Sequence, residues 1–343
     1  MKKILLPESD GKIKYYRANL HCHSNISDGH KTPEQLKADY KAHGYDVLCI
    51  TDHDILISHN DITDDEFLML NGYEIEVNGP DSKTCHLCLV ALEPDNDIQV
   101  CYHRTEYMSG NQQKNRYRIK YDETKPDFVR EYTAECINEI IRTGVENGFF
   151  VTYNHPTWSL ESYPEYMRYE GMNAMEIASF ASFVAGYDDD NGHCYDDLLR
   201  GGKRLFCTAT DDNHNRVSDD FPECGSYGGY IMIASPSLKY TDITTALKNG
   251  QFYSSTGSYL RKGPEILSLS VEDDKVFIKT SDARSIALIP DNRDNRCRNA
   301  LDGETINEAE FTLGKNVKWF RIVVADNNGY KAYSNAYFTD ELK

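Results

Sequence analysis

The chain has 343 residues, of which 40% are apolar, and it carries a formal net charge of −18. This length suits one large domain with a smaller one, and the composition excludes collagen-like, coiled-coil and largely disordered chains. The acidity argues against binding to duplex nucleic acid or to anionic membranes through a basic face. A small anionic substrate remains compatible with it, because bound divalent ions dominate the local field.

Only three apolar residues separate Lys3 from Pro7, which is too few for the core of a signal peptide. No later run approaches the length of a membrane span, so the sequence predicts a cytoplasmic protein without a membrane partner. The ten cysteines lie mostly in apolar stretches, as expected for buried reduced thiols. Cys85 and Cys88 form a single CxxC without a second pair at zinc-ribbon spacing. Nothing in the sequence indicates an oligomeric state.

Short apolar runs along the first two thirds of the chain predict buried strands, and most of them stop at a His, Asp or Glu. These runs are YYRANL before His21, YDVLCIT before Asp52, FLMLNGY before Glu74, HLCLVAL from His86, GFFVTYN before His155, NAMEIAS containing Glu176, and KRLFCTAT before Asp211 and Asp212. Helices are predicted over about 32–44, 127–147 and 242–248, the first capped by Thr32 and the last by Thr241. Strands that alternate with helices indicate a parallel sheet or barrel, in which functional groups gather at the carboxyl ends of the strands.

Two segments depart from this rhythm. Residues 93–125 are polar and rich in tyrosine, and they predict an insertion that is either a lid over one face or a surface excursion. From about residue 261 onward, short alternating runs with turn signals predict a small β-sandwich. The expected domains are therefore 1–260 and 261–343.

Candidate metal ligands stand at the predicted strand ends. His21 and His23 are two residues apart, so both side chains point to the same face of a strand and can hold one ion, although two surface histidines would give the same pattern. The other candidates are Asp28, His53, Glu74, His86, His155, Asp212 and His214. Asp211 competes with Asp212, and the D-x-H spacing to His214 favours Asp212. Carboxylates and imidazoles are costly to bring together without a cation, and such mixed sites suit Zn, Mn or Fe.

Taken in order, HCHSNISDGH, ITDHD, NGYEIEV, CHLCLVAL, YNHP and TDDNHN resemble the motifs of the PHP (polymerase and histidinol phosphatase) metallohydrolases over about residues 15–256. The resemblance implies a distorted (β/α)7 barrel with two or three divalent ions. It assigns His21 and His23 to one ion, with Glu74 and Asp212 shared or bridging. It assigns Glu74, His86 and His155 to a second ion, and Asp28, His53 and His214 to a third. The segment GQFYSSTGSYL, with KGPEI and the tail, resembles the CehA/McbA-like branch, which also resembles a carbamate-ester hydrolase.

The expected function is a metal-dependent phosphoesterase acting on a small phosphoester, with Glu74 and Asp212 as catalytic bridging ligands. His193 is a candidate for protonating the leaving group or contacting phosphate, and Arg17 and Arg216 are candidate anion contacts; a plain surface role remains open for each. Glu176 either supports a ligand or is simply satisfied by backbone. The alternatives are an amide or carbamate-ester hydrolase on the same site, and a non-catalytic metal-binding or carbohydrate-associated module.

Overall fold

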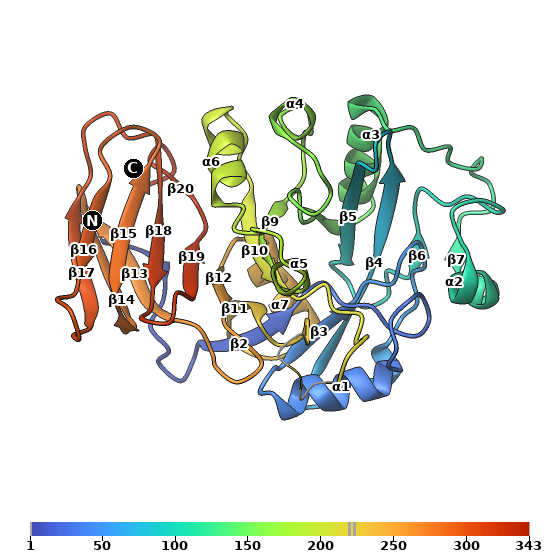
Figure 1. Cartoon of the computed structure of the whole chain (residues 1–343), viewed down its shortest axis with the longest axis horizontal. Helices are drawn as coiled ribbons and strands as arrows, with labels where there is room; N and C mark the ends of the chain where they lie inside the picture. Colours follow the sequence, from blue (N-terminus) through green and yellow to red (C-terminus); the bar gives the residue numbers. More distant parts are fainter. Residues whose placement is uncertain (1, 219–220, 222–223, 343) are drawn as a thin grey trace.

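The computed structural model describes residues 2–218, 221 and 224–342. Its elements form two bodies, with the strands from β13 onward gathered at one end beside the N-terminus (Figure 1). The segment with α2 and β7 lies at the opposite end of the molecule. None of the described helices combines the length and hydrophobicity that crossing a bilayer requires.

The larger body is built on one mixed sheet whose strands run in the order β10-β9-β8-β5-β4-β3-β2-β11-β12. All of the predicted apolar runs appear in it as strands, and nearly every residue of the central ones is buried, which explains their continuous apolar sequences. The strands are β2 (Lys14–Asn19), β3 (Val47–Ile50), β4 (Leu68–Asn78), β5 (Thr84–Ala91), β8 (Phe149–Tyr153), β9 (Ala174–Ser179), β10 (Phe206–Thr210), β11 (Gly229–Ser235) and β12 (Phe252–Thr256).

The mixed α/β class is confirmed, but a closed (β/α)7 barrel is not observed. β4 and β5 form an antiparallel hairpin without a helix between them, and β5 also runs antiparallel to β8. No ladder joins β10 to β11 within the described residues. The two edges instead meet closely: a side chain at Gly229 would collide with the Thr210 carbonyl, and the Ser254 hydroxyl on β12 donates to the Cys207 carbonyl at 2.7 Å.

The helices surround this sheet and differ from the prediction in two places. The predicted helix 127–147 begins only at residue 134, because the Thr133 side chain caps it by accepting from the Cys136 amide. The last predicted helix begins at Tyr240, so Thr241 lies inside it and is not its cap. The helices are α1 (Pro33–Ala42), η1 (Asn60–Ile62), α3 (Ala134–Glu146), α4 (Tyr163–Tyr166), α5 (Phe180–Val184), α6 (Gly192–Arg200) and α7 (Tyr240–Lys248).

The C-terminal strands form two antiparallel arrangements that share one apolar core, as expected for a β-sandwich. One contains the strand order β1-β13-β14-β17, so the first strand of the chain pairs with strands from the tail. The other continues from β12 through β19, β18 and β15 to β16. The strands are β1 (Lys2–Leu6), β13 (Ile266–Glu272), β14 (Lys275–Ala283), β15 (Ser285–Pro290), β16 (Arg296–Asn299), β17 (Ile306–Thr312), β18 (Trp319–Ala325), β19 (Lys331–Ser334) and β20 (Tyr337–Phe338).

The insertion at 93–125 has small elements of its own, which are β6 (Ile98–Gln99), α2 (Gly110–Asn115), η2 (Arg116–Arg118) and β7 (Lys120–Tyr121). Its Tyr102 and Ile119 share an apolar cluster with Ile26, Ile55 and Ile57 from two loops of the larger body. The insertion is therefore attached by packing to the loops that precede Asp28 and follow His53.

Candidate metal centre

The ends of β2 and β10 are fastened together by their backbones. The His23 amide donates to the Asn213 carbonyl, and the Asp212 amide donates to the His21 carbonyl, both at 3.0 Å. These bonds place Asp212 beside the two histidines of the HxH pair, with its carboxylate 3.1 Å from His23 Nε2 and 3.2 Å from His21 Nε2. Residues separated by about 190 positions in sequence thereby face one another.

Glu74 lies at the centre of the cluster. It sits within β4 and not at the strand's end as predicted, and it is completely buried. Its Oε1 lies 3.1 Å from both His21 Nε2 and His86 Nδ1, while its Oε2 lies 3.1 Å from His53 Nδ1 and 3.4 Å from His23 Nε2. The two oxygens of one carboxylate thus face different imidazoles, which is the geometry of a bridging ligand.

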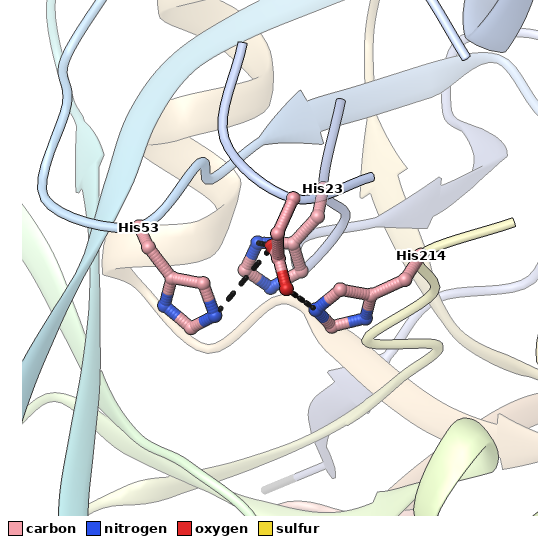
Figure 2. A group of neighbouring side chains, drawn as sticks. His23, His53 and His214 are labelled. Atoms are coloured by element: carbon pink, nitrogen blue, oxygen red, sulfur yellow. Dashed lines mark ion pairs between the residues drawn. The ribbon is translucent and has the colours of Figure 1, made fainter. Parts of the chain in front are cut away.

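Two of the three predicted ligand sets converge, each with ligand atoms within 4.8 Å of one another. His21, His23, Glu74 and Asp212 form one group. Asp28, His53 and His214 form another, which His23 joins; Figure 2 shows the three histidine rings turned toward one another.

The remaining predicted set is regrouped. Glu74 and His86 gather with His53, whereas His155 gathers with His21 and Glu176. His155 Nε2 still lies 3.5 Å from Glu74 Oε1, so it belongs to the same continuous cluster. All nine predicted ligands therefore lie in this cluster, and their binding of metal stays a prediction.

The cluster's hydrogen bonding fits a divalent cation. Among the described residues, His23 Nδ1, His53 Nδ1 and Glu74 Oε2 are buried without a well-oriented hydrogen bond, although His53 Nδ1 and Glu74 Oε2 lie 3.1 Å apart. Such atoms are costly to bury unless something else satisfies them, and nitrogen and carboxylate oxygen are suitable ligands for Zn, Mn or Fe. Their clustering suggests divalent metal ions.

The pKa values of the clustered histidines also indicate a site for a cation. Burial alone would lower the pKa of His21, but the charges of Cys88, Glu74 and Asp212 raise it well above its ordinary value. Burial likewise disfavours the charged form of His53, and Glu74 nevertheless raises the pKa of His53 to about 10. A site that draws protons onto its imidazoles is short of positive charge, and a bound cation supplies that charge in their place.

Glu176 holds two of the histidines from behind. Its Oε1 accepts from His21 Nδ1 at 2.7 Å and from the Thr210 hydroxyl at 2.6 Å, and its Oε2 accepts from the His155 amide at 2.9 Å. A carboxylate that accepts from the far nitrogen of a ligating imidazole fixes the ring and increases its basicity. Of the two roles left open by the sequence, the support of a ligand is the one that this geometry favours.

Two further carboxylates organise the surrounding backbone. Asp52 accepts from the amide and hydroxyl of Ser24 and from those of Ser27, which shapes the loop that ends at Asp28. Asp211 accepts from the Tyr40 hydroxyl and from the amides of residues 227–229, so both of its carboxylate oxygens already have donors from the chain. It is not part of any of the groups of candidate metal ligands.

Asn154 is a residue that the sequence analysis missed. Its Nδ2 donates to Glu74 Oε1 at 2.8 Å and so helps to fix the central carboxylate. Its position directly before His155 at a strand end was the available signal. His155 itself has φ of 24° and Asp212 has φ of 52°, values in the left-handed region that are strained for residues with side chains. Backbone strain of this kind concentrates at functional sites.

A cavity of about 670 Å³ opens onto the cluster. Six of the candidate ligands line it: Asp28, His53, His86, His155, Asp212 and His214. Lys83, Arg216 and Trp158 line it as well, whereas no residue of the 93–125 insertion does. In the described structure the insertion therefore does not form a lid on this cavity. It packs instead against the loops that contain Ile26 and Ile55.

The three predicted substrate contacts are placed differently from one another. Arg216 lines the cavity, with Nη2 3.3 Å from Asp28 Oδ2. Arg17 is buried between the rings of Tyr45 and Tyr230, and its two terminal nitrogens donate to backbone carbonyls, so a substrate contact is not supported. His193 does not line the cavity either; its side chain is 85% exposed on α6 and faces Asp197, so the predicted catalytic and phosphate contacts are not supported.

Residues 19–171 match the model of the PHP domain family. The expected resemblance is confirmed at this level, while the CehA/McbA-like branch stays a prediction. A search of curated proteins finds no match.

Solved structures resemble the chain at low identity. A two-domain protein from Bacteroides vulgatus, containing a predicted PHP-like metal-dependent phosphoesterase, is 15% identical with a TM-score of 0.47, over 97% of this chain and 98% of that one. A candidate metal-dependent phosphoesterase from Bifidobacterium adolescentis is 15% identical with a TM-score of 0.38, over 58% and 88%. An amidohydrolase from Chromobacterium violaceum, with bound sulfate and no metal, is 19% identical with a TM-score of 0.39, over 60% and 93%.

Replacing Glu176 by glutamine should weaken metal binding about 10- to 100-fold, because the amide no longer supports His21 with a full negative charge. Competition with a chelator, followed by elemental analysis, measures this directly. Glu170→Gln is the matched control, since Glu170 is exposed and pairs with Lys203 away from the cluster. Equal affinity in the two variants would remove Glu176 from the support of the metal centre.

The insertion should stabilise the metal-binding group of His23, Asp28, His53 and His214. Gln99 accepts from the Leu56 amide and donates to the Asp54 carbonyl, both at 2.8 Å, so it holds the backbone that follows His53. Gln99→Leu should lower the affinity of the weakest-bound ion about tenfold. Titration of metal content against a chelator tests this, with the exposed Gln113→Leu of the same insertion as control. An unchanged titration would leave the insertion without influence on the centre.

Metal binding should tighten as the pH rises. Despite burial, which opposes protonation, Glu74 and neighbouring carboxylates raise the pKa of His53 to about 10 and that of His155 to about 9. Protons therefore compete with metal for these nitrogens, and the competition weakens toward alkaline pH. Chelator competition between about pH 6 and pH 9 should show a steadily increasing affinity and proton release on binding. A pH-independent affinity would contradict the assignment of these imidazoles as ligands.

Proposed function

We propose that the protein is a metal-dependent phosphoesterase that hydrolyses a small phosphoester with water. The observation that carries the proposal is the position of Glu74, whose two oxygens face separate sets of imidazoles, among them His53 and His86, which line the cavity. This arrangement suits two or three ions of Zn, Mn or Fe held side by side. In the reaction, the oxygen of water forms a bond to phosphorus, the bond to the alcohol oxygen breaks, and the alcohol leaves with a proton.

When bound, the ions lower the pKa of water and offset the negative charge of the phosphoryl oxygens. The chain's residues supply the positions. Glu74 and Asp212 are shared between neighbouring histidines, and Glu176 fixes the orientation of His21. Arg216 and Lys83 are the lysine and arginine side chains that line the same cavity within the described residues. Ions held by the candidate ligands on the cavity wall would be accessible to a substrate in the cavity.

The substrate is proposed to be a small molecule. The cavity has the volume of a typical small-molecule site. The net charge of −18 repels a long polyanion outside the region that bound cations control, which disfavours duplex nucleic acid.

An amide or carbamate ester is the second candidate substrate. Lys83 lies 2.6 Å from Glu165, and Arg216 lies 3.3 Å from Asp28, so both cationic side chains of the cavity already have acidic partners. This pairing reduces the positive charge that a phosphate would meet and favours a less charged substrate. A non-catalytic metal-binding or carbohydrate-associated role is disfavoured, because the cluster contains every ligand of the predicted sets.

Purified protein loaded with Mn, Zn or Fe should hydrolyse phosphomonoesters or phosphodiesters and lose this activity when a chelator removes the metal. Glu74→Gln should reduce the rate on the order of 100-fold or more, because it weakens the shared ligand. Asp28→Ala should have a smaller effect, since Asp28 belongs only to the group that contains His53 and His214. Glu66→Gln is the control, because Glu66 lies on the surface and pairs with Lys41.

The substrate panel should include carbamates and amides. Metal-loaded enzyme that ignores every phosphoester and cleaves a carbamate would replace the proposed function with the second candidate.

A further inference from the structure

We infer that the cavity binds an aromatic leaving group against Trp158, so that the substrate is an aryl phosphoester. This inference rests on the proposed function and specifies its substrate class. The chain has two tryptophans, and they occupy contrasting positions: Trp319 on β18 is buried at 2% exposure, whereas Trp158 is 38% exposed and lines the cavity.

The candidate metal ligands themselves fix the position of Trp158. Its ring centroid lies 5.0 Å from that of His155 at an interplanar angle of 78°, and 5.4 Å from that of His86 at 63°. These are edge-to-face contacts, the arrangement that aromatic rings prefer over face-to-face stacking. The Ser159 amide also donates to the His155 carbonyl at 3.0 Å, and this hydrogen bond closes the turn that contains Trp158. The indole is therefore held next to the reaction centre while a large part of its surface remains accessible.

Apolar side chains line the same cavity as Trp158. Ala181 and Val184 on α5, Ala185 directly after it, and Val217 all line it. A flat aromatic group gains from contact with this apolar surface and with the exposed indole. Polar side chains, among them Asn78, Ser182 and Asn215, line other parts of the cavity. The exposed indole beside His86 and His155, with these apolar side chains in the same cavity, thus favours an aromatic leaving group.

The size of the cavity supports the same class. A volume of about 670 Å³ is far more than a phosphate group requires and lies within the usual range for organic ligands. With the phosphate directed at the imidazoles and carboxylates, the remaining space adjoins Trp158. Hydrolysis in this orientation forms the bond from water oxygen to phosphorus and breaks the bond from phosphorus to the aryl oxygen. The products are a phenol and inorganic phosphate.

The kinetic test compares phenyl phosphate with glycerol phosphate and glucose 6-phosphate on the full-length, Mn-loaded protein. Aryl phosphates are intrinsically more reactive, so the informative quantity is the change in the ratio of kcat/KM values when Trp158 is replaced. Trp158→Ala should reduce this aryl preference about tenfold, mainly through KM, and Trp158→Phe should restore most of it. Tyr163→Ala, which removes another exposed aromatic ring from the same segment, should leave the ratio unchanged.

Metal content is measured for each variant, because Trp158 contacts His86 and His155. A lower aryl preference at equal metal content supports a direct contact with the leaving group. An aryl preference that is the same in Trp158→Ala and in the unaltered protein would overturn the inference.

Fluorescence gives a readout that does not depend on catalysis. In a Trp319→Phe protein, Trp158 is the remaining tryptophan, and 4-nitrobenzylphosphonate should quench its emission saturably, whereas methylphosphonate should not. Saturable quenching in a metal-loaded protein that cleaves no phosphoester would refute the proposed function and leave the aromatic site standing. Efficient cleavage of glycerol phosphate without quenching by the aryl ligand would refute the aromatic site and leave the proposed function standing.

Discussion

The centre depends on keeping the carboxylate of Glu74 charged although it is completely buried. Burial opposes ionisation, and the surrounding imidazoles of His21, His86 and His53 hold the pKa of Glu74 well below its usual value. A charge of this kind is tolerated only where opposite charge and hydrogen bonds surround it. Because the imidazoles come from the segment after β2, from β5 and from the loop after β3, the packing of these strands is a precondition of the site.

A second set of carboxylates keeps the first in place. Glu176 fixes His21 and the backbone of His155, Asp52 fixes the loop before Asp28, and Asp211 fixes the approach to β11. Each of these three accepts hydrogen bonds from donors of the chain, whereas Glu74 Oε2 faces the imidazoles of His53 and His23 and accepts no well-oriented hydrogen bond among the described residues. The protein therefore separates carboxylates that shape its backbone from those that remain available to a cation. Such preorganisation reduces the reorganisation needed when metal binds.

The sequence predicted the features for which burial imposes a pattern of apolar residues. It did not predict the direction of each strand, the pairing of strands far apart in the chain, or the orientation of individual side chains. The buried strands read as continuous apolar runs, and the ligands at or near their ends converge as expected. The β4–β5 hairpin was missed because the expected alternation of strands and helices outweighed the turn signal in NGPDSK. The pairing of β1 with β13 joins residues some 265 positions apart and leaves no local trace. Arg17 and His193 show that nearness to a motif in sequence does not fix where a side chain points.

The charge of the molecule links metal binding to substrate binding. Without cations, the carboxylates around the cavity and the net charge of −18 would repel a phosphoester. With cations bound, the same carboxylates would hold positive charge where the phosphate oxygens of the proposed substrate would lie. Linkage then requires that a phosphoester strengthen metal binding by the factor with which metal strengthens phosphoester binding. Lys83 and Arg216 cannot replace the ions in this role, because Glu165 and Asp28 already neutralise them. In the proposed enzyme the ions therefore determine both the reactivity of water and whether the substrate enters at all.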